Sequence, residues 1–270
     1  MNTLLRRAVP YLARPLLSRI HRYRGAHRGE SCYLIGDGVS IKWFDIGVFS
    51  DKTAIPCAFL PFHREFSRLD VRYLSIQEPW AFYPWERSMD GRLHLTGNPI
   101  LAMYRSFIRH NRDKEFFVNL SNAPVLWSRN VTFTFRDFHD PALPENFITR
   151  RTGAFEGSLR FSISLAIYLG FENIYLVGYD YTHKASRRHH WYEKGQGVFQ
   201  EVPGYNREFF GIAQEYADIT AITLDGGAEF IRSVTYEQHT GRKPIFRENT
   251  ELMDERYLRV LATWPGYNIY

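Results

Sequence analysis

GSLRFSISLAIYLGFENIYLVGYD, residues 157–180, is the stretch that decides the fold. Small residues open it, apolar residues at helical spacing follow over Ser158–Leu169, and Gly170 predicts a sharp helix end. The apolar run Asn173–Val177 then predicts a buried strand that ends in the loop Gly178–Asp180. A helix followed directly by a buried strand is one unit of a parallel sheet, and ligands bind such sheets beyond the carboxyl ends of their strands.

A second unit begins near the amino end of the chain. Ser31–Ile35 predicts a buried first strand, and the turn Gly36–Ser40 follows it directly. Together the two units predict an α/β fold, a Rossmann-like, mostly parallel sheet with flanking helices, that handles a nucleotide. We expect further strands at Thr53–Leu60, Val71–Ile76, Phe116–Leu120, Val131–Phe135 and Thr220–Leu224, and further helices at Asn206–Ala217 and Thr250–Thr263.

The charge is uneven along the chain of 270 residues. The residues before Glu30 hold seven arginines and no acid, which leaves 27 basic against 29 acidic residues in the rest. This near-neutral body argues against a broad nucleic-acid surface. Residues 1–29 carry apolar side chains at helical spacing and predict a basic amphipathic segment on an anionic membrane surface, although a disordered tail or a helix packed on the body fits the same pattern. The apolar side chains are Leu5, Val9, Leu12, Leu16 and Ile20.

Residues 30–270 predict a single domain of this fold, with residues 181–205 as a lid because they show no clean period and carry six charged side chains. No apolar run is long enough to span a bilayer. Cys32 and Cys57 lie in strand-like runs, which indicates buried, reduced thiols. No CxxC or HExxH spacing is present, so we expect no metal site.

Two segments are candidates for binding phosphate. Gly36, Asp37, Gly38 and Ser40 follow a strand, where glycines let backbone approach a ligand closely and amides cradle an anion. Gly157-Ser158 opens the long helix, whose first amides can hold an anion. Each segment also fits a purely structural role, a tight turn in the first case and a capped helix in the second.

Titratable side chains gather where the predicted strands end. Asp180, Tyr181 and His183 follow one strand, and His189, His190 and Tyr192 lie in the predicted lid. An extended backbone points His189 and His190 to opposite sides, so one of the two at most faces the site. His63 and Glu78 follow two other predicted strands and reach the same edge of the sheet. Such groups are candidates for acid–base chemistry.

Two motifs carry a resemblance to a known family. YLIGDGVS at 33–40 resembles the first-strand motif of bacterial sialyltransferases of glycosyltransferase family 42, and the stretch from Ser158 to Asp180 is similar to their second signature. The wider superfamily includes Kdo transferases and pyrophosphokinase-like proteins, and HHWY at 189–192 is similar to its lid pattern. The resemblance spans about Ser31–Tyr192. Asp37 and Val39 depart from it, since the family has Asn and Pro there.

The resemblance implies a GT-A-like variant fold, a CMP-activated acidic sugar as donor, and no metal cofactor. It implies that Gly36, Asp37, Gly38, Ser40, Gly157 and Ser158 meet the nucleotide, that Asp180 lies with them, and that Tyr181 and Tyr192 donate to the leaving phosphate. His190 or His189 would then be the base, with Glu78, His183 and His63 as further candidates.

We therefore expect an inverting glycosyltransferase that moves sialic acid, another nonulosonic acid or Kdo to a glycan of a surface polysaccharide or lipopolysaccharide. It would lie in the cytoplasm on the inner face of the inner membrane, and assembly into a homo-oligomer stays open. Two alternatives remain at this stage: a Mg²⁺-dependent pyrophosphokinase-like relative using Asp37, Asp180 and Glu78, and a non-catalytic nucleotide- or glycan-binding protein.

Overall fold

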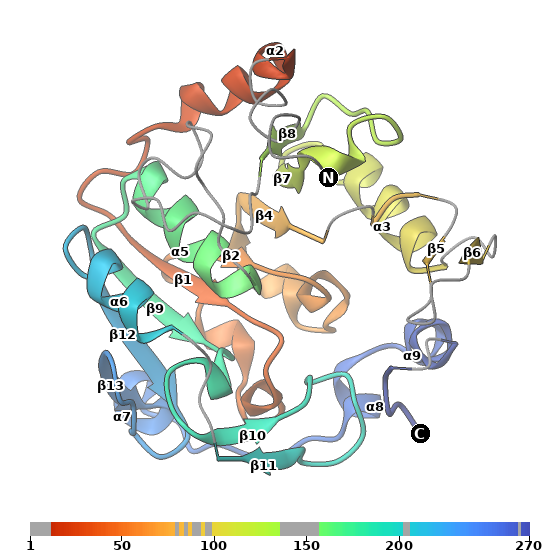
Figure 1. The fold of residues 1–270 in the computed structure, drawn as a ribbon. Helices are drawn as coiled ribbons and strands as arrows, with labels where there is room; N and C mark the ends of the chain where they lie inside the picture. Colours follow the sequence, from red (N-terminus) through yellow and green to blue (C-terminus); the bar gives the residue numbers. More distant parts are fainter. Residues whose placement is uncertain are drawn as a thin grey trace.

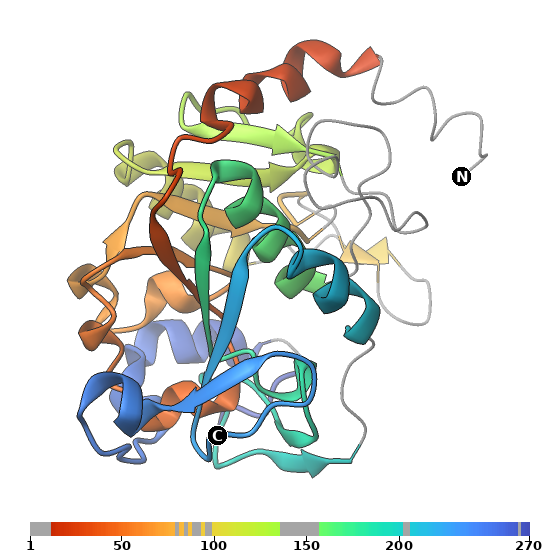
Figure 2. The ribbon, with the colours of Figure 1, turned by 90° about the vertical axis from the view of Figure 1, so that its left-hand side faces the viewer.

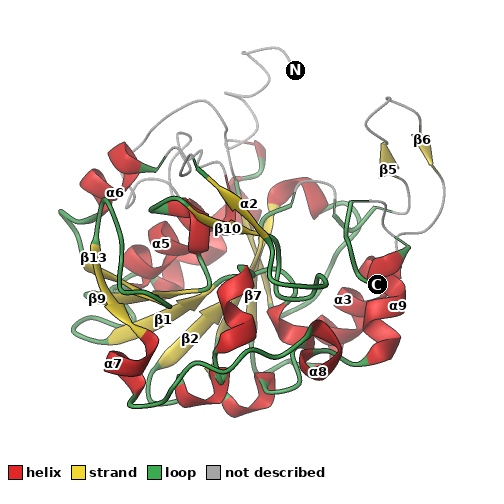
Figure 3. Ribbon diagram, turned by 90° about the horizontal axis from the view of Figure 1, so that it is seen from below, coloured by secondary structure: helices red, strands yellow, loops and turns green. Residues whose placement is uncertain are grey.

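The structure is a computed structural model that describes residues 12–78, 81–83, 86–87, 93–94, 99–135, 157–201, 206–263 and 266–270. Its centre is a parallel sheet in the order β13-β12-β9-β1-β2-β3. Figure 3 shows β9, β1 and β2 side by side. The strands are β1 (Ser31–Ile35), β2 (Thr53–Pro56), β3 (Asp70–Val71), β9 (Asn173–Val177), β12 (Asp218–Thr223) and β13 (Arg232–Thr235).

A second parallel set extends this sheet. Its order is β4 (Tyr73–Ile76), β7 (Glu115–Asn119) and β8 (Val131–Thr134). Only the exposed Arg72 separates β3 from β4, and a parallel bridge between Cys57 and Ser75 joins the two sets. The predicted strand 71–76 is therefore interrupted at Arg72, where the chain changes partner from β2 to β7.

Both faces of the sheet are buried, as continuous apolar strands require. Along β1, Cys32 and Leu34 pack into one core cluster, and Tyr33 and Ile35 pack into the other. The first cluster is covered by α5 (Gly157–Leu169) and α6 (Arg207–Ala213), and Figure 1 shows α5 lying across the strands. The second is covered by α3 (Pro99–His110), α7 (Tyr236–Thr240), α8 (Asn249–Leu252) and α9 (Glu255–Ala262).

The predicted helices and strands agree with the structure at most positions, with corrections at their ends. The strand expected to reach Leu60 ends at Pro56, because Ala58 takes a left-handed φ of +40° and turns the chain. The helix expected over 250–263 is two helices, because Asp254 accepts the Arg256 N–H at 3.0 Å and caps a new start. The helix expected over 206–217 is shorter, Arg207–Ala213.

The predicted lid, residues 181–205, carries a short antiparallel hairpin. Its strands are β10 (Ser186–Arg188) and β11 (Val198–Gln200), and residues 202–205 lie outside the described part. A further two-stranded pair is formed by β5 (Glu86–Arg87) and β6 (Leu93–His94). The hairpin, α3, β13 and α7 are elements that the sequence patterns did not predict.

The described part of the basic amino-terminal segment packs on the body. It forms α2 (Arg14–Leu17) and a 3₁₀ helix, Ser18–Tyr23, which lie beside β8 (Figure 2). Ile20 is 1% exposed inside the core. Leu12, by contrast, is 81% exposed, and residues 1–11 with Leu5 and Val9 lie outside the described part. None of the described helices is long and apolar enough to cross a bilayer.

Candidate functional site

The two predicted motifs meet at the switch point of the sheet. β1 lies between β2 and β9, so the loops that leave β1 and β9 run side by side at the carboxyl edge. The Gly36 N–H donates to the Val177 carbonyl at 2.8 Å, and the Gly38 N–H donates to the Gly178 carbonyl at 2.7 Å. The predicted nucleotide loop and the loop after the second signature are thus one structure.

The glycines of these loops are explained by this loop-to-loop contact. A Cβ atom on Gly36 would lie 2.6 Å from the Gly178 carbonyl oxygen, and one on Gly38 would lie 2.4 Å from Asp180 Oδ2. Gly178 itself has a φ of +69°. The structural role is therefore sufficient to require glycine here, and a role in binding a phosphate stays a prediction.

Asp180 and Ser40 join the same two loops. The Ser40 N–H, in the first turn of the 3₁₀ helix Val39–Trp43, donates to Asp180 Oδ2 at 2.9 Å. Burial raises the pKa of Asp180, while the hydrogen bond from Ser40 acts in the opposite direction. One carboxylate oxygen of Asp180 is therefore already bound by a protein donor. That donor, the Ser40 N–H, belongs to the first turn of a 3₁₀ helix that begins at the site.

Asp37 is a buried carboxylate that connects three segments. Its Oδ1 accepts the indole Nε1–H of Trp191 at 3.1 Å, and its Oδ2 accepts the Phe59 N–H at 2.9 Å. Burial raises the pKa of Asp37 to about 6, against the opposing effect of these donors. The structure places Asp37 at the predicted site, but both of its oxygens already have protein donors. Its predicted contact with nucleotide stays untested.

His190 forms a hydrogen-bonded couple with Glu193. Its Nδ1 lies 2.7 Å from Glu193 Oε1, and its side chain is 42% exposed while that of Glu193 is 7% exposed. Burial alone would raise the pKa of Glu193, but hydrogen bonds from His190 and Asn268 outweigh it and lower the pKa to about 2. An ionised Glu193 only accepts, so the proton lies on Nδ1 and the lone pair lies on Nε2.

Packing fixes the plane of the His190 ring. The ring stacks on Tyr192 with centroids 4.9 Å apart and an interplanar angle of 7°, and it meets Tyr267 edge-on at 5.7 Å. An antiparallel bridge between Gly38 and His190 holds the segment beside the loop after β1. A partly exposed imidazole with a carboxylate on Nδ1 and fixed rings around it has the arrangement of a general base.

The other candidate histidines lack this arrangement. Burial lowers the pKa of His63 to about 3 and, as the leading cause, that of His183 to about 4, so both are neutral. His63 packs edge-on against Trp191 at 5.0 Å. His189 has a strained φ of +146°, and its Nδ1 is buried without a hydrogen-bond partner among the described residues. The strained turn at His189 leads directly into His190.

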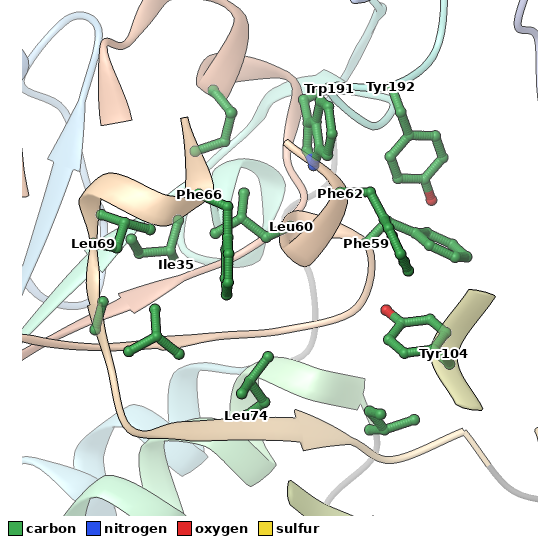
Figure 4. Packing of buried hydrophobic residues seen from close by; sticks show 14 of the residues in the cluster. Ile35, Phe59, Leu60, Phe62, Phe66, Leu69, Leu74, Tyr104, Trp191 and Tyr192 are labelled. Carbon is green, nitrogen blue, oxygen red and sulfur yellow. The ribbon is translucent and has the colours of Figure 1, made fainter. Parts of the chain in front are cut away.

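Glu78 and a group of aromatic side chains lie near Asp37 and Trp191. The carboxylate of Glu78, exposed beyond the end of β4, acts electrostatically on Asp37, Tyr104 and Tyr267. Asn122 positions the loop that carries it, since its Nδ2 donates to the Glu78 carbonyl at 3.1 Å. Figure 4 shows Tyr192 beside Trp191, and Tyr104 on the far side of Phe59, against which it packs with ring centroids 5.8 Å apart. The loops after β1, β2, β4 and β9 therefore converge on one site.

The two predicted phosphate-binding tyrosines differ in their surroundings. Tyr192 is 1% exposed beneath His190, and burial raises its pKa well above the usual range. Tyr181 is partly exposed, with the Arg188 guanidinium 5.9 Å from its ring centroid. Tyr181 thus remains open to a ligand, whereas Tyr192 supports the ring of His190.

The start of α5 lies at the same edge, beside a residue that follows β2. The buried Cys57 thiol, beyond the end of β2, has the hydroxyls of Ser158 and Tyr179 as polar neighbours. The first turn of α5 therefore lies near the end of β2. Arg150 and Arg151 lie outside the described part, and Arg160 donates to Asn206 Oδ1 at 2.8 Å.

Lys42 and Glu248, which the sequence patterns did not identify, bind the backbone at the end of segment 190–195. Lys42 is fully buried, donates to the Gly195 carbonyl at 2.6 Å and forms an ion pair with Glu248. Glu248 in turn accepts the Gly195 N–H at 3.1 Å. The spacing H-x-x-E in HHWYE is a sequence signal that could have identified Glu193. Lys42 and Glu248 are 206 positions apart, so no local pattern in the sequence indicates that they pair. Among the described residues, no three His, Cys, Asp or Glu side chains gather to hold a metal.

No protein-family model matches this chain, and no curated protein matches it. The chain is similar to solved structures of the sialyltransferase CstII. One, from Campylobacter jejuni with the substrate analogue CMP-3FNeuAc, is 12% identical with a TM-score of 0.43 over 81% of this chain and 90% of that one. Another, from the same organism with cytidine-5'-monophosphate, is 13% identical with a TM-score of 0.41 over 86% and 97%.

A variant of CST-II in complex with CMP is 12% identical to this chain, with a TM-score of 0.45 over 81% of this chain and 91% of that one. At these identities and TM-scores the likeness fixes neither donor nor acceptor.

Proposed function

We propose that this chain is an inverting glycosyltransferase that takes a CMP-activated acidic sugar as donor and uses His190 as its base. The observation that carries the proposal is the His190–Glu193 couple, held beside the switch point of a parallel sheet. The couple provides a base, and the start of α5 provides backbone amides for an anion. The motif resemblance supplies the class of donor.

The chemistry follows from the positions of these groups. His190 Nε2 removes the proton from an acceptor hydroxyl as that oxygen attacks the anomeric carbon. The bond from the anomeric carbon to the phosphate oxygen breaks, and CMP leaves with the electron pair. Amides at the start of α5 and the Tyr181 hydroxyl stabilise the departing phosphate. The proton resides on the imidazole, where ionised Glu193 stabilises the imidazolium.

The donor class is tested by calorimetry of the purified chain against CMP, CDP, UDP, GDP and ATP, each with EDTA and with Mg²⁺. We expect CMP or CDP to bind in EDTA. Binding of ATP that requires Mg²⁺ would favour phosphoryl transfer, since Mg²⁺ bridges the phosphates in that chemistry. Binding of cytidine nucleotides with no turnover of CMP-sialic acid, CMP-Kdo or related donors would favour a non-catalytic binding protein.

We also propose that the acceptor is a lipid-linked or surface glycan reached from the inner face of the inner membrane, through the basic residues 1–29. Ile20 lies in the core and takes no part in this contact, whereas Leu12 and the arginines at 14, 22, 24 and 28 are exposed. Deletion of residues 1–11 should weaken binding to anionic vesicles and leave turnover of a soluble acceptor unchanged. Equal vesicle binding by the deleted and full chains would contradict this role.

A further inference from the structure

Residues 267–269 lie against the His190–Glu193 couple although about 75 positions separate the two segments. The Asn268 N–H donates to Glu193 Oε2 at 3.1 Å. The Asn268 carbonyl accepts the Lys194 N–H at 2.7 Å. One residue thus makes two backbone hydrogen bonds to consecutive residues of the segment that carries the proposed base.

The segment 267–269 is itself anchored. Ile269 is 3% exposed within the core, and its carbonyl accepts Asn249 Nδ2–H at 3.0 Å. The same Asn249 amide donates to the Tyr192 carbonyl at 3.0 Å, and Asn249 is 1% exposed. A single buried amide on α8 therefore fixes the segment 267–269 and the segment of His190 relative to each other.

Tyr267 completes the contact. Its ring meets His190 edge-on at 5.7 Å and meets Tyr192 edge-on at 5.1 Å. Because Tyr192 stacks beneath His190, the imidazole has an aromatic face below it and an aromatic edge beside it. These contacts pack one face and one side of the His190 ring.

The two oxygens of Glu193 have separate tasks. Oε1 accepts from His190, at Nδ1 and at the backbone N–H, and Oε2 accepts from Asn268. Without the Asn268 donor, Oε2 would be a buried acceptor that has lost a hydrogen bond. The carboxylate could then recover a hydrogen bond by rotating away from His190. We propose that residues 267–269 form a positioning segment that holds Glu193, and through it His190 in its Nδ1–H tautomer, in the reactive arrangement.

This inference rests on the proposed function for its effect on turnover, but its structural content can be measured separately. Asn268→Pro removes the N–H that Glu193 accepts, and Asn268→Ala is the matched control that keeps it. In ¹⁵N-histidine spectra of the neutral imidazoles, we expect the wild type and Asn268→Ala to show the Nδ1–H tautomer of His190. We expect Asn268→Pro to show a mixture of tautomers.

In transfer assays with a CMP-activated donor, Asn268→Pro should lower kcat about tenfold or more relative to Asn268→Ala, with little change in the KM for the donor. In a Glu193→Gln background the proline should add little further loss, because both changes act on the same contact. Should the proline variant fail to fold, an amide-to-ester replacement at Asn268 removes the donor and keeps the backbone.

Identical His190 tautomers in the wild type and in the chain that lacks the Asn268 donor would overturn the positioning role, whatever the activity. Losses in kcat that simply add in the double variant would also overturn it. A wild type that turns over no CMP-activated sugar, yet shows the tautomer change, would instead contradict the proposed function and leave the positioning of His190 supported.

Discussion

Trp191 and Asp37, 154 positions apart in the sequence, make two hydrogen bonds to each other. The indole Nε1–H donates to Asp37 Oδ1 at 3.1 Å, and the Trp191 N–H donates to the Asp37 carbonyl at 3.1 Å. The residue after the proposed base is thereby tied to the loop after β1. The departure of Asp37 from the asparagine of the resembled motif has a physical reason here, because both of its oxygens accept N–H donors. An asparagine amide nitrogen would face one of those donors instead.

Trp191→Phe should destabilise the chain by about 1–3 kcal/mol, because it leaves a buried carboxylate oxygen without its indole donor. Urea unfolding measures the change. Trp127→Phe is the control, since Trp127 is 71% exposed and its replacement should shift stability by less than about 0.5 kcal/mol. Equal effects of the two changes would show that the indole hydrogen bond contributes nothing.

Asp37 should make stability depend on pH in a definite direction. Its pKa is raised to about 6, so the folded chain binds the proton more tightly than the unfolded chain, and its contribution is lost as pH rises through 6. Between pH 7.5 and 4.5 the wild type should gain about 2 kcal/mol relative to Asp37→Asn. Unfolding at both pH values measures this difference.

The pKa of Glu193 is shifted in the opposite direction, and this sets the lowest pH at which the Asp37 experiment should be made. Its pKa is lowered to about 2, so its stabilising contribution is present above pH 4.5 and is lost below it. Parallel stability curves for the wild type and Asp37→Asn above pH 4.5 would contradict the raised pKa of Asp37.

Lys42→Met should cost about 3 kcal/mol, because it leaves Glu248 without its ion-pair partner and the Gly195 carbonyl without its donor. Chemical denaturation gives the value. Lys243→Met, at an exposed position, is the matched control and should be nearly neutral. Hydrogen exchange of the Gly195 amide, which donates to Glu248, should accelerate in the Lys42 variant alone. Unaltered exchange would mean that the ion pair does not fasten this segment.

Ala58→Gly should raise stability by about 0.5–1 kcal/mol, since Ala58 holds a left-handed φ of +40° that glycine adopts freely. Ala213→Gly, at the buried end of α6, should lower it by about 1–2 kcal/mol, because it removes a core methyl group and glycine disfavours helix. Thermal unfolding of the two variants measures both signs. A loss of stability in both would remove backbone strain as the reason that β2 ends where it does.

The sequence patterns predicted the parts of the fold that local order determines. The apolar run at 173–177 and the helix before it needed only their own periodicity, and both agree with the structure. The gathering of Gly36–Ser40 with Gly178–Asp180 also followed, because carboxyl ends of parallel strands share an edge. α3 went unpredicted, although it packs as an ordinary helix.

The remaining parts depend on contacts between distant residues. No local pattern in the sequence marks Asn249 or Asn268. Yet the side-chain amide of Asn249 and the backbone N–H of Asn268 both bind the segment 190–194. The choice between His189 and His190 likewise depended on which ring Tyr192, Tyr267 and Glu193 surround, and alternation along the chain left it open.

The most direct test of the account is the rate of transfer from CMP-sialic acid, CMP-Kdo and related donors by the wild type, His190→Asn and His189→Gly. The glycine variant removes the neighbouring imidazole and suits the φ of +146° at that position. With the donor that the wild type accepts, we expect His189→Gly to retain transfer and His190→Asn to lose about 10²-fold or more, with CMP binding unchanged in both. Full transfer by His190→Asn would contradict the assignment of the base and, with it, the function proposed for this site.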